Sequence, residues 1–281
     1  MRALLVATFS IVLGCAAAPT TERYGLCDAS AALIVDGSLW VADDETNQLF
    51  RFGEGTQPTQ TLLIDDGKEI DFEAVAYNGT EAYWIGSHAA NREGKRPRKR
   101  RTVVITRFDE SGGARVERSF ESGLRQALEQ DARYGFADFE IEAASFSAAG
   151  DLWIGLRAPL RDDSAWIVPV LAPVDLEQPQ LGDPILLSLD GHGLRAMSRL
   201  DEGWWLLAAK DLYLWDGVGE PQRWLATPWQ VEAVAPDRAN RRIALIADDG
   251  TREIDGQPCK RLDSAARRFR GRWIDGPEQV Y

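Results

Sequence analysis

Five short segments of this 281-residue chain repeat one pattern, in which a polar residue stands just before small and apolar residues. If the segments are equivalent strands around one axis, their polar side chains gather at one end of it. Three of the five carry a carboxylate and one a guanidinium, so the gathering would make a binding site for an ion or a charged ligand. The five residues are Ser30, Glu73, Glu142, Arg195 and Glu232.

Carboxylates held close together raise one another's pKa unless a cation lies between them. In this chain the cation is either Arg195 or a bound metal ion. Calcium fits the predicted ligands Glu73, Glu142 and Glu232 better than zinc, because the donors are oxygens and no cluster of cysteine and histidine accompanies them. We therefore expect either a calcium site or a buried ring of ion pairs around Arg195 that holds the segments in register.

Each repeated segment is followed by a second apolar segment that also ends in polar residues. A second strand antiparallel to the first returns to the same end of the central axis. We call this end the channel mouth. His88 and Arg157 follow such strands directly, so both join the predicted binding mouth, with a solvated loop position as the alternative for His88. The aspartates at these ends have an alternative role in turns. The ends read Asp43-Asp44, Ser87-His88, Arg157, Lys210 and Asp248-Asp249.

Residues 92–101 form a basic segment with seven cationic side chains and one acidic one, Glu93. It follows a second strand, so the antiparallel argument places it at the same mouth. There it would attract phosphate groups, including those of lipids. The alternative is a solvated loop without a ligand.

The repeated pairs of segments decide the fold class. The first segments begin DASAALIV, FEAVAYN, IEAASFS, LRAMSRL and VEAVAPD. Further extended segments such as QLFRF and RTVVITRF follow, rich in β-branched and aromatic residues and bounded by turn formers. Four short strands per unit, at spacings of about forty residues, predict an all-β propeller with five blades. A β-sandwich would need no such internal repeat.

The interval between Glu73 and Glu142 is long enough for a sixth blade, which is the alternative. We assign the extra length to an insertion in or after the second blade. The insertion includes the basic segment and one predicted short helix, Ser122 to Arg133, in which apolar residues recur at i, i+3 and i+4.

The first residues have the composition of a signal peptide. Arg2 precedes an apolar run that ends at Gly14 and is too short to span a membrane permanently. We therefore expect residues 1–14 to be removed on export, leaving a short tether over residues 15–25 and one propeller domain over residues 26–281.

Cys15 is the predicted site of lipidation, because the residues before it resemble the bacterial lipobox. Ala16 follows the cysteine in place of Asp, which resembles the signal that sorts lipoproteins to the outer membrane. We expect the protein on the periplasmic face, at the outer more than at the inner membrane. The alternative is an ordinary secretory peptide cut after one of the three alanines at 16–18.

Cys27 and Cys259 are the two other cysteines, and export would place both in an oxidising compartment. One lies near the start of the predicted domain and the other near its end. A disulfide between them would restrict the unfolded chain across a very long loop. Two separate buried thiols are the alternative.

Several segments resemble the domain-of-unknown-function 3616 family of bacterial β-propellers, notably FEAVAYNGTEAYWIGSHAANREGKRPRKRRTVVITRF, FEIEAASFSAAGDLWIGLRAPL, VADDETN and GHGLRAMS. More remotely, the chain is similar to esterase-like propellers grouped with phytases. The resemblance extends from about Leu26 to Trp273 and implies a propeller, while the family has no agreed activity. The chain has Ala74, Ala143 and Ala233 where the family repeat has glycine.

Two hypotheses about function follow. The first is a lipid-anchored, exported propeller that binds a small anionic ligand or a periplasmic protein at its charged mouth. The alternative is a calcium-dependent phosphoester hydrolase, in which the glutamates bind calcium and Arg157, Arg195 or the basic segment hold the phosphate. The sequence lacks a Gly-x-Ser-x-Gly elbow, a P-loop and a dinucleotide glycine motif. A net charge of −12 argues against nucleic acid as a ligand.

Overall fold

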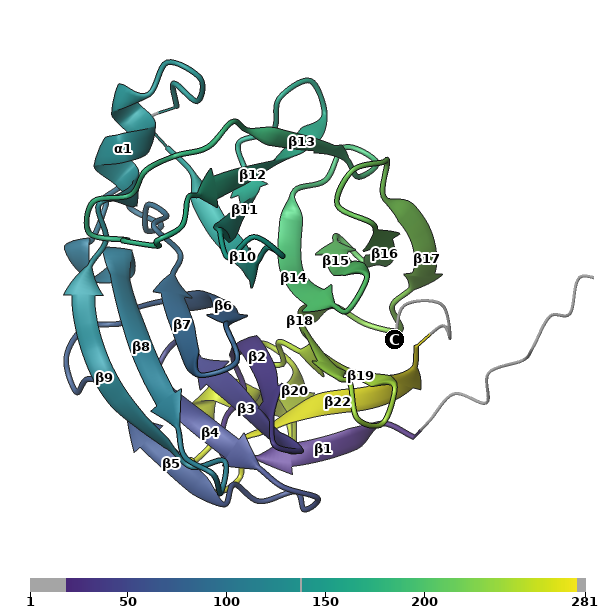
Figure 1. Cartoon of the computed structure of the whole chain (residues 1–281). Coiled ribbons are helices and arrows are strands. Elements are labelled where there is room, and N and C mark those ends of the chain that lie inside the picture. The colour runs from purple at the N-terminus through teal and green to yellow at the C-terminus, as the bar shows by residue number, and fades with distance from the viewer. Residues whose placement is uncertain (1–18, 137, 277–281) are drawn as a thin grey trace, which may run out of the picture.

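The computed structural model describes residues 19–136 and 138–276, which form an all-β propeller. Within these ranges, five four-stranded antiparallel sheets stand as blades around a common axis (Figure 1). The inner strands of neighbouring blades pack against one another, and the fifth packs against the first, so the ring is closed. The prediction of five blades is confirmed, and the six-blade alternative is wrong.

Blades 1 to 4 each use four consecutive strands, which succeed one another from the axis outward. Blade 1 contains β2 (Ala29–Val35), β3 (Ser38–Asp43), β4 (Gln48–Phe52) and β5 (Gln60–Leu63). Blade 2 contains β6 (Phe72–Tyr77), β7 (Glu81–Gly86), β8 (Thr102–Phe108) and β9 (Ala114–Glu121). Blade 3 contains β10 (Glu140–Phe146), β11 (Leu152–Ala158), β12 (Ser164–Val170) and β13 (Ile185–Ser188). Blade 4 contains β14 (Leu194–Leu200), β15 (Gly203–Ala208), β16 (Asp211–Trp215) and β17 (Gln222–Ala226).

Blade 5 combines both ends of the described chain. Its outermost strand is N-terminal and pairs antiparallel with the last strand, so that Thr21 lies opposite Gly271 (Figure 1). The connection before the last strand holds the short hairpin of β20 (Glu253–Ile254) and β21 (Gln257–Pro258) and the 3-10 helix η2 (Cys259–Arg261). The blade contains β18 (Val231–Asp237), β19 (Arg242–Ala247), β22 (Arg268–Asp275) and β1 (Thr21–Tyr24).

Strand β1 lies inside residues 15–25, the segment expected to be a tether. Its sequence, TERY, is polar, and its partner strand lies at the other end of the chain, so local pattern gave no sign of it. Residues 21–24 therefore belong to the folded domain. The predicted signal peptide, residues 1–14, and the predicted lipidation site, Cys15, lie outside the described residues.

Burial decreases from the middle of each blade outward. All six residues of β3 and of β15 are buried, because blades cover both faces of these strands. Trp40, Trp84 and Trp205, each on the second strand of its blade, are fully buried and fill the space between neighbouring sheets. The outermost strands are less buried than the inner ones, and β9 and β17 are largely exposed.

One short α-helix, α1 (Leu124–Gln130), follows blade 2 within the described chain, so the predicted insertion is confirmed. The helix is shorter than the predicted range Ser122 to Arg133. It buries Leu124 and Leu128 against the core between blades 2 and 3. A 3-10 turn, η1 (Arg98–Arg101), precedes β8. No helix in the described ranges combines the length and apolar composition needed to cross a bilayer.

A disulfide joins Cys27 to Cys259 across a sequence separation of 232 residues. Both residues are buried in a small apolar cluster with Ile254 and Leu262. The bridge fastens the start of blade 1 to the connection that precedes β22. It therefore closes the ring covalently beside the place where β1 closes it through hydrogen bonds.

Candidate functional site

Every inner strand carries a β-bulge at the same position of the repeat. The register shifts fall between Ala29 and Ala31 in β2 and at the equivalent places in β6, β10, β14 and β18. A bulge inserts an unpaired residue and redirects its side chain. The five residues at the bulges are the polar ones predicted from the repeat: Ser30, Glu73, Glu142, Arg195 and Glu232.

Two of the three predicted glutamate ligands, Glu142 and Glu232, contact arginines. Glu142 accepts a hydrogen bond from Arg157 Nη1 at 2.5 Å, and Arg195 Nε lies 3.9 Å from its other oxygen. Arg195 Nη1 donates to Glu232, which also accepts from Gln230 Nε2 at 2.7 Å. Burial raises the pKa of Glu142 to about 7, while Arg195 and Arg157 oppose the rise. In this part of the mouth Arg195 therefore links Glu142 of blade 3 to Glu232 of blade 5.

Glu73, the third predicted ligand, instead lies with two aspartates. One carboxylate oxygen each from Asp44, Asp71 and Glu73 lies within 4.8 Å of the others. We call these three residues the acidic trio. Burial raises the pKa of Glu73 well above its usual range, and the charges of Glu142 and Asp44 raise it further. Burial and the neighbouring acids have the same effect on the pKa of Asp44.

Further acids continue this half of the mouth over blades 1 and 5. Asp28 precedes β2 and is nine-tenths buried, and its pKa is raised to about 7 by burial, by Glu45 and by Asp248. Burial raises the pKa of Asp43 to about 6. Each of these groups loses hydration without gaining enough positive charge, so the acidic half favours the uptake of protons or of a cation.

The other half of the mouth, which we call the basic half, has several cationic side chains around one hollow. A hollow of about 420 Å³ lies between blades 3, 4 and 5, and four of its lining side chains are Arg157, His192, Arg195 and Lys210. Lys210 is exposed, and its ammonium has no hydrogen bond or ion pair within the described chain. At Gly193 a Cβ atom would lie 1.9 Å from the carbonyl oxygen of Arg157, so glycine is required for the loop to approach that strand.

His88 does not join either half. Its side chain is fully buried, stacks on Phe139 and has both ring nitrogens occupied. Nδ1 donates to the carbonyl oxygen of Gly86 at 2.8 Å, so Nε2 accepts from Ser122 Oγ at 2.6 Å. Burial lowers the pKa of His88 to about 4, which keeps the ring neutral. The histidine anchors the segment before α1, which differs from both the predicted mouth position and the solvated loop.

Much of the basic segment, residues 92–101, is engaged in ion pairs on the molecule's own surface. Arg96 pairs with Asp138, and Lys99 pairs with Asp65 at 2.6 Å. Arg100 contacts Glu69 at 2.6 Å and Asp71 at 3.0 Å. These contacts differ from the sequence expectation of a positively charged arm directed at phosphate.

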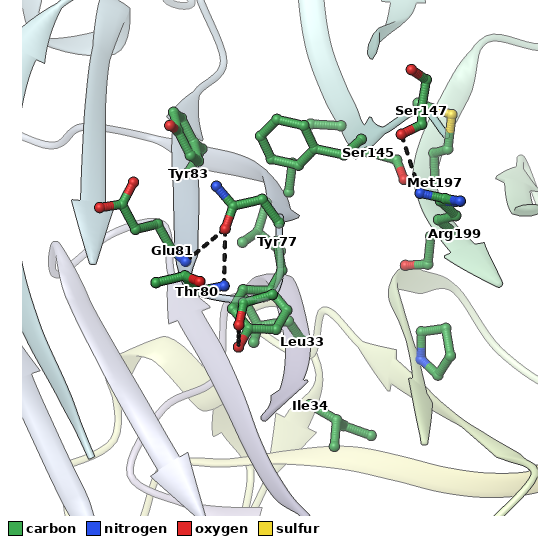
Figure 2. A pocket seen from close by; sticks show the side chains of 18 of the residues that line it. Leu33, Ile34, Tyr77, Thr80, Glu81, Tyr83, Ser145, Ser147, Met197 and Arg199 are labelled. Atoms are coloured by element: carbon green, nitrogen blue, oxygen red, sulfur yellow. Dashed lines mark hydrogen bonds between the residues drawn. The ribbon is translucent and has the colours of Figure 1, made fainter. Parts of the chain in front are cut away.

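The larger cavity lies at the opposite end of the channel, where the inner strands end. It has a volume of about 1090 Å³ and a mixed lining that includes Leu33, Tyr83 and Met197 (Figure 2). Arg199 projects near its wall and donates to the carbonyl oxygen of Ser147 at 3.1 Å (Figure 2). We place the candidate site at the charged mouth instead, because strongly perturbed carboxylates and several cations converge there.

Sequence reasoning did not identify Asp28 and Asp71 as site residues. Both stand two residues before a bulge residue, and the same position holds Glu140 in blade 3 and Gln230 in blade 5. A comparison of the repeats at this position would have found them. His192 has no equivalent in the repeat, and Lys210 stands out in the sequence only as the residue at the end of a strand.

A family model described as a protein of unknown function, DUF3616, matches residues 28–112, which cover blade 1 and three strands of blade 2. No curated protein sequence matches the chain. The relation to phytase-type propellers stays a prediction.

Two solved structures are similar to this chain over most of its length. The crystal structure of glutaminyl cyclase from Myxococcus xanthus has a TM-score of 0.55 and 11% sequence identity, over 92% of this chain and 97% of that one. The β-propeller domain of Cps50 (Swd1) from Myceliophteria thermophila has a TM-score of 0.44 and 12% identity, over 92% of this chain and 100% of that one. At such identities the likeness concerns the fold and not the chemistry.

Proposed function

We propose that this propeller binds a small anionic ligand, a phosphate or a carboxylate, in the basic half of its charged mouth. The observation that carries the proposal is the convergence of Arg157, His192, Arg195 and Lys210 on one hollow of about 420 Å³. A hollow of that volume accommodates a small metabolite. The adjacent acids repel the anion from the rest of the mouth and so restrict it to this hollow.

The cationic side chains of the hollow would contact a bound anion in different ways. Arg195 is largely buried and held by Glu142 and Glu232, so it supplies a fixed positive charge at the base. Arg157 is partly exposed and has N–H groups left over after its Nη1 contacts Glu142 and Glu140. Lys210 has no other partner in the described structure, and its flexible ammonium can reach the bound anion.

Titration of the protein with inorganic phosphate, succinate and a neutral sugar, followed by calorimetry, tests this proposal. We expect the anions to bind and the sugar to give no signal. Lys210→Glu should weaken anion binding at least about tenfold, or about 1.4 kcal/mol. The matched control is Lys95→Glu, which reverses an exposed lysine that pairs with Glu93 outside the hollow. Equal weakening by both variants would indicate a general effect of net charge and contradict the site.

The hydrolase hypothesis is tested in the same preparation. The protein is an enzyme if it releases product from a simple phosphoester in the presence of calcium and Arg157→Gln abolishes this activity. Binding of phosphate without hydrolysis of the phosphoester supports the hypothesis that the protein is a binding module.

We further propose that the propeller is exported and held at the periplasmic face of the outer membrane by a lipid on Cys15. The apolar run before the cysteine supports this proposal. Cys15→Ser should move the protein from the membrane fraction to the soluble fraction and abolish incorporation of labelled palmitate. Retention of the variant in membranes without label would contradict lipidation at this residue.

A further inference from the structure

We infer that the acidic trio, Asp44, Asp71 and Glu73, is a binding site for one hard divalent cation of the calcium type, separate from the proposed anion site. The three carboxylates come from the residue after β3, from the residue before β6 and from the bulge of β6. One oxygen of each lies within 4.8 Å of the others. A single ion at their centre could contact all three after small side-chain rotations.

Unpartnered oxygen atoms support this inference independently of the grouping. Asp44 Oδ1 is fully buried and accepts no hydrogen bond in the described structure. Neither Asp44 nor Glu73 forms an ion pair or side-chain hydrogen bond with any described residue. Buried polar atoms in proteins almost always form hydrogen bonds, so a buried carboxylate oxygen without one indicates a bound ligand.

A second orphaned carboxylate adjoins the trio. Asp28 is only 9% exposed, and no described residue pairs with its side chain. Its carbonyl oxygen accepts from the backbone nitrogen of Asp44 at 3.3 Å, which fixes the two residues side by side. At Gly250 a Cβ would lie 1.6 Å from Asp28 Oδ1, so only glycine lets the carboxylate occupy this position.

The cations near the trio do not balance its charge. Arg100 Nη1 lies 3.0 Å from Asp71 and also contacts Glu69. Lys260 pairs with Glu45 at 3.0 Å, beyond the trio. Lys260 offsets the charge of Asp28 only in part, and no described cation pairs with Asp44 or Glu73. An ionised carboxylate without a partner is strongly disfavoured in a buried position, so these groups either hold protons or share a cation.

The donor chemistry selects the class of ion. All the candidate ligands are carboxylate oxygens, which suit calcium and magnesium. His88, the histidine closest in sequence to the trio, has both ring nitrogens occupied by Gly86 and Ser122. A site without nitrogen or sulfur donors does not favour zinc or copper.

The site differs in position and charge from the anion hollow. The trio belongs to blades 1 and 2, whereas the hollow lies between blades 3, 4 and 5. Glu142 and Glu232 lie with the arginines that separate the two. Cation binding can therefore be measured without any anionic ligand, and its result does not depend on the proposed function.

Calorimetric titration of the full-length protein with calcium chloride, together with thermal unfolding, tests the inference. We expect one calcium ion per chain, with a dissociation constant below about 1 mM, and a higher melting temperature with calcium. Magnesium should bind more weakly, because it demands a stricter octahedral geometry than these flexible ligands provide.

The melting temperature of Asp44→Asn distinguishes a loss of calcium binding from misfolding. The substitution removes a repelling charge, so it should raise the melting temperature without calcium and abolish the increase that calcium produces. Glu73→Gln should weaken calcium binding at least about tenfold, since it removes a charged ligand of similar shape. The matched control is Glu110→Gln, an exposed acid in the β8–β9 turn, which should bind calcium like the unmodified protein.

Two results would overturn the inference. One is the absence of both heat and stabilisation at calcium concentrations well above about 1 mM. The other is binding that Asp44→Asn and Glu73→Gln leave unchanged, which would place the ion elsewhere in the protein.

Discussion

Replacing both bridged cysteines, as Cys27→Ala with Cys259→Ala, should lower the free energy of unfolding by about 5 kcal/mol. The bridge spans 232 residues of sequence, so it removes conformational freedom from almost the whole unfolded chain. Alanine is small and apolar and leaves the surrounding cluster with Ile254 and Leu262 without an unpaired polar atom. Equilibrium unfolding in urea measures the loss.

Reduction of the unmodified protein provides the control for this prediction. Dithiothreitol should lower the stability of the unmodified protein to that of the double variant and leave the variant itself unchanged. The pairing of β1 with β22 remains in both, so the reduced propeller should still be folded. A loss below about 1 kcal/mol would mean that this strand pairing closes the ring without help from the bridge.

Arg195→Met should cost about 3 kcal/mol of stability, because it removes the charge between two buried carboxylates. Arg195 contacts Glu232 directly and lies 3.9 Å from Glu142, whose Oε2 atom is buried without a hydrogen bond. Methionine fills similar space but leaves both acids without this cation. Urea unfolding of the variant beside the unmodified protein measures the difference.

The loss should depend on pH in a defined direction. The folded pKa of Glu142 is raised from 4.5 to about 7. A group raised in this way favours folding below its unfolded pKa, and that contribution is lost as the pH rises through the folded value. Removing Arg195 raises the folded pKa further. The variant should therefore be most destabilised at about pH 8 and much less so at about pH 5.

Two further variants test whether the buried charge causes the loss of stability. Adding Glu232→Gln to Arg195→Met should recover part of the stability, since the second change removes one of the orphaned acids. Arg238→Met removes an exposed arginine that pairs with exposed Asp201 and donates to the carbonyl oxygen of Arg199, and it should change stability by less than about 1 kcal/mol. A loss of equal size at pH 8 and pH 5 would show that Arg195 acts through packing alone.

Local repetition explains how far the site could be predicted. The residues at positions 30, 73, 142, 195 and 232 share one local pattern, and each occupies the same bulge in its strand. Asp44, Arg157 and Asp248 also occupy equivalent positions, because each directly follows the residue that pairs with the one before the bulge. Equivalent local sequences adopt equivalent local geometry, so the residues at the channel mouth can be recognised from the sequence.

Individual partners could not be predicted in this way. The sequence suggested calcium among Glu73, Glu142 and Glu232, whereas the structure groups Glu73 with Asp44 and Asp71. Glu142 and Glu232 are held by arginines from blades 3 and 4. Which charges meet depends on the spacing of neighbouring blades and on the reach of each side chain, and neither quantity is encoded in the repeat.

His88 illustrates the same limit on a single residue. It follows β7 as expected, but the inserted segment after β9 places Ser122 and Phe139 against its ring. No local pattern connects residues so far apart in the chain. The strand β1 is a similar case, since its only sheet partner is β22 at the other end of the described chain.

The five repeated units, their inner strands and the polar residue that each presents to the channel mouth follow from the sequence alone, because these features depend on neighbours within a few residues. The division of the mouth into an acidic half and a basic half follows only from the folded ring. The division arises when the closed ring brings Asp28, Asp44 and Glu73 together on one side and Arg157 and Lys210 together on the other. Electrostatic interactions act across space between blades, so the order of residues along the chain does not fix them.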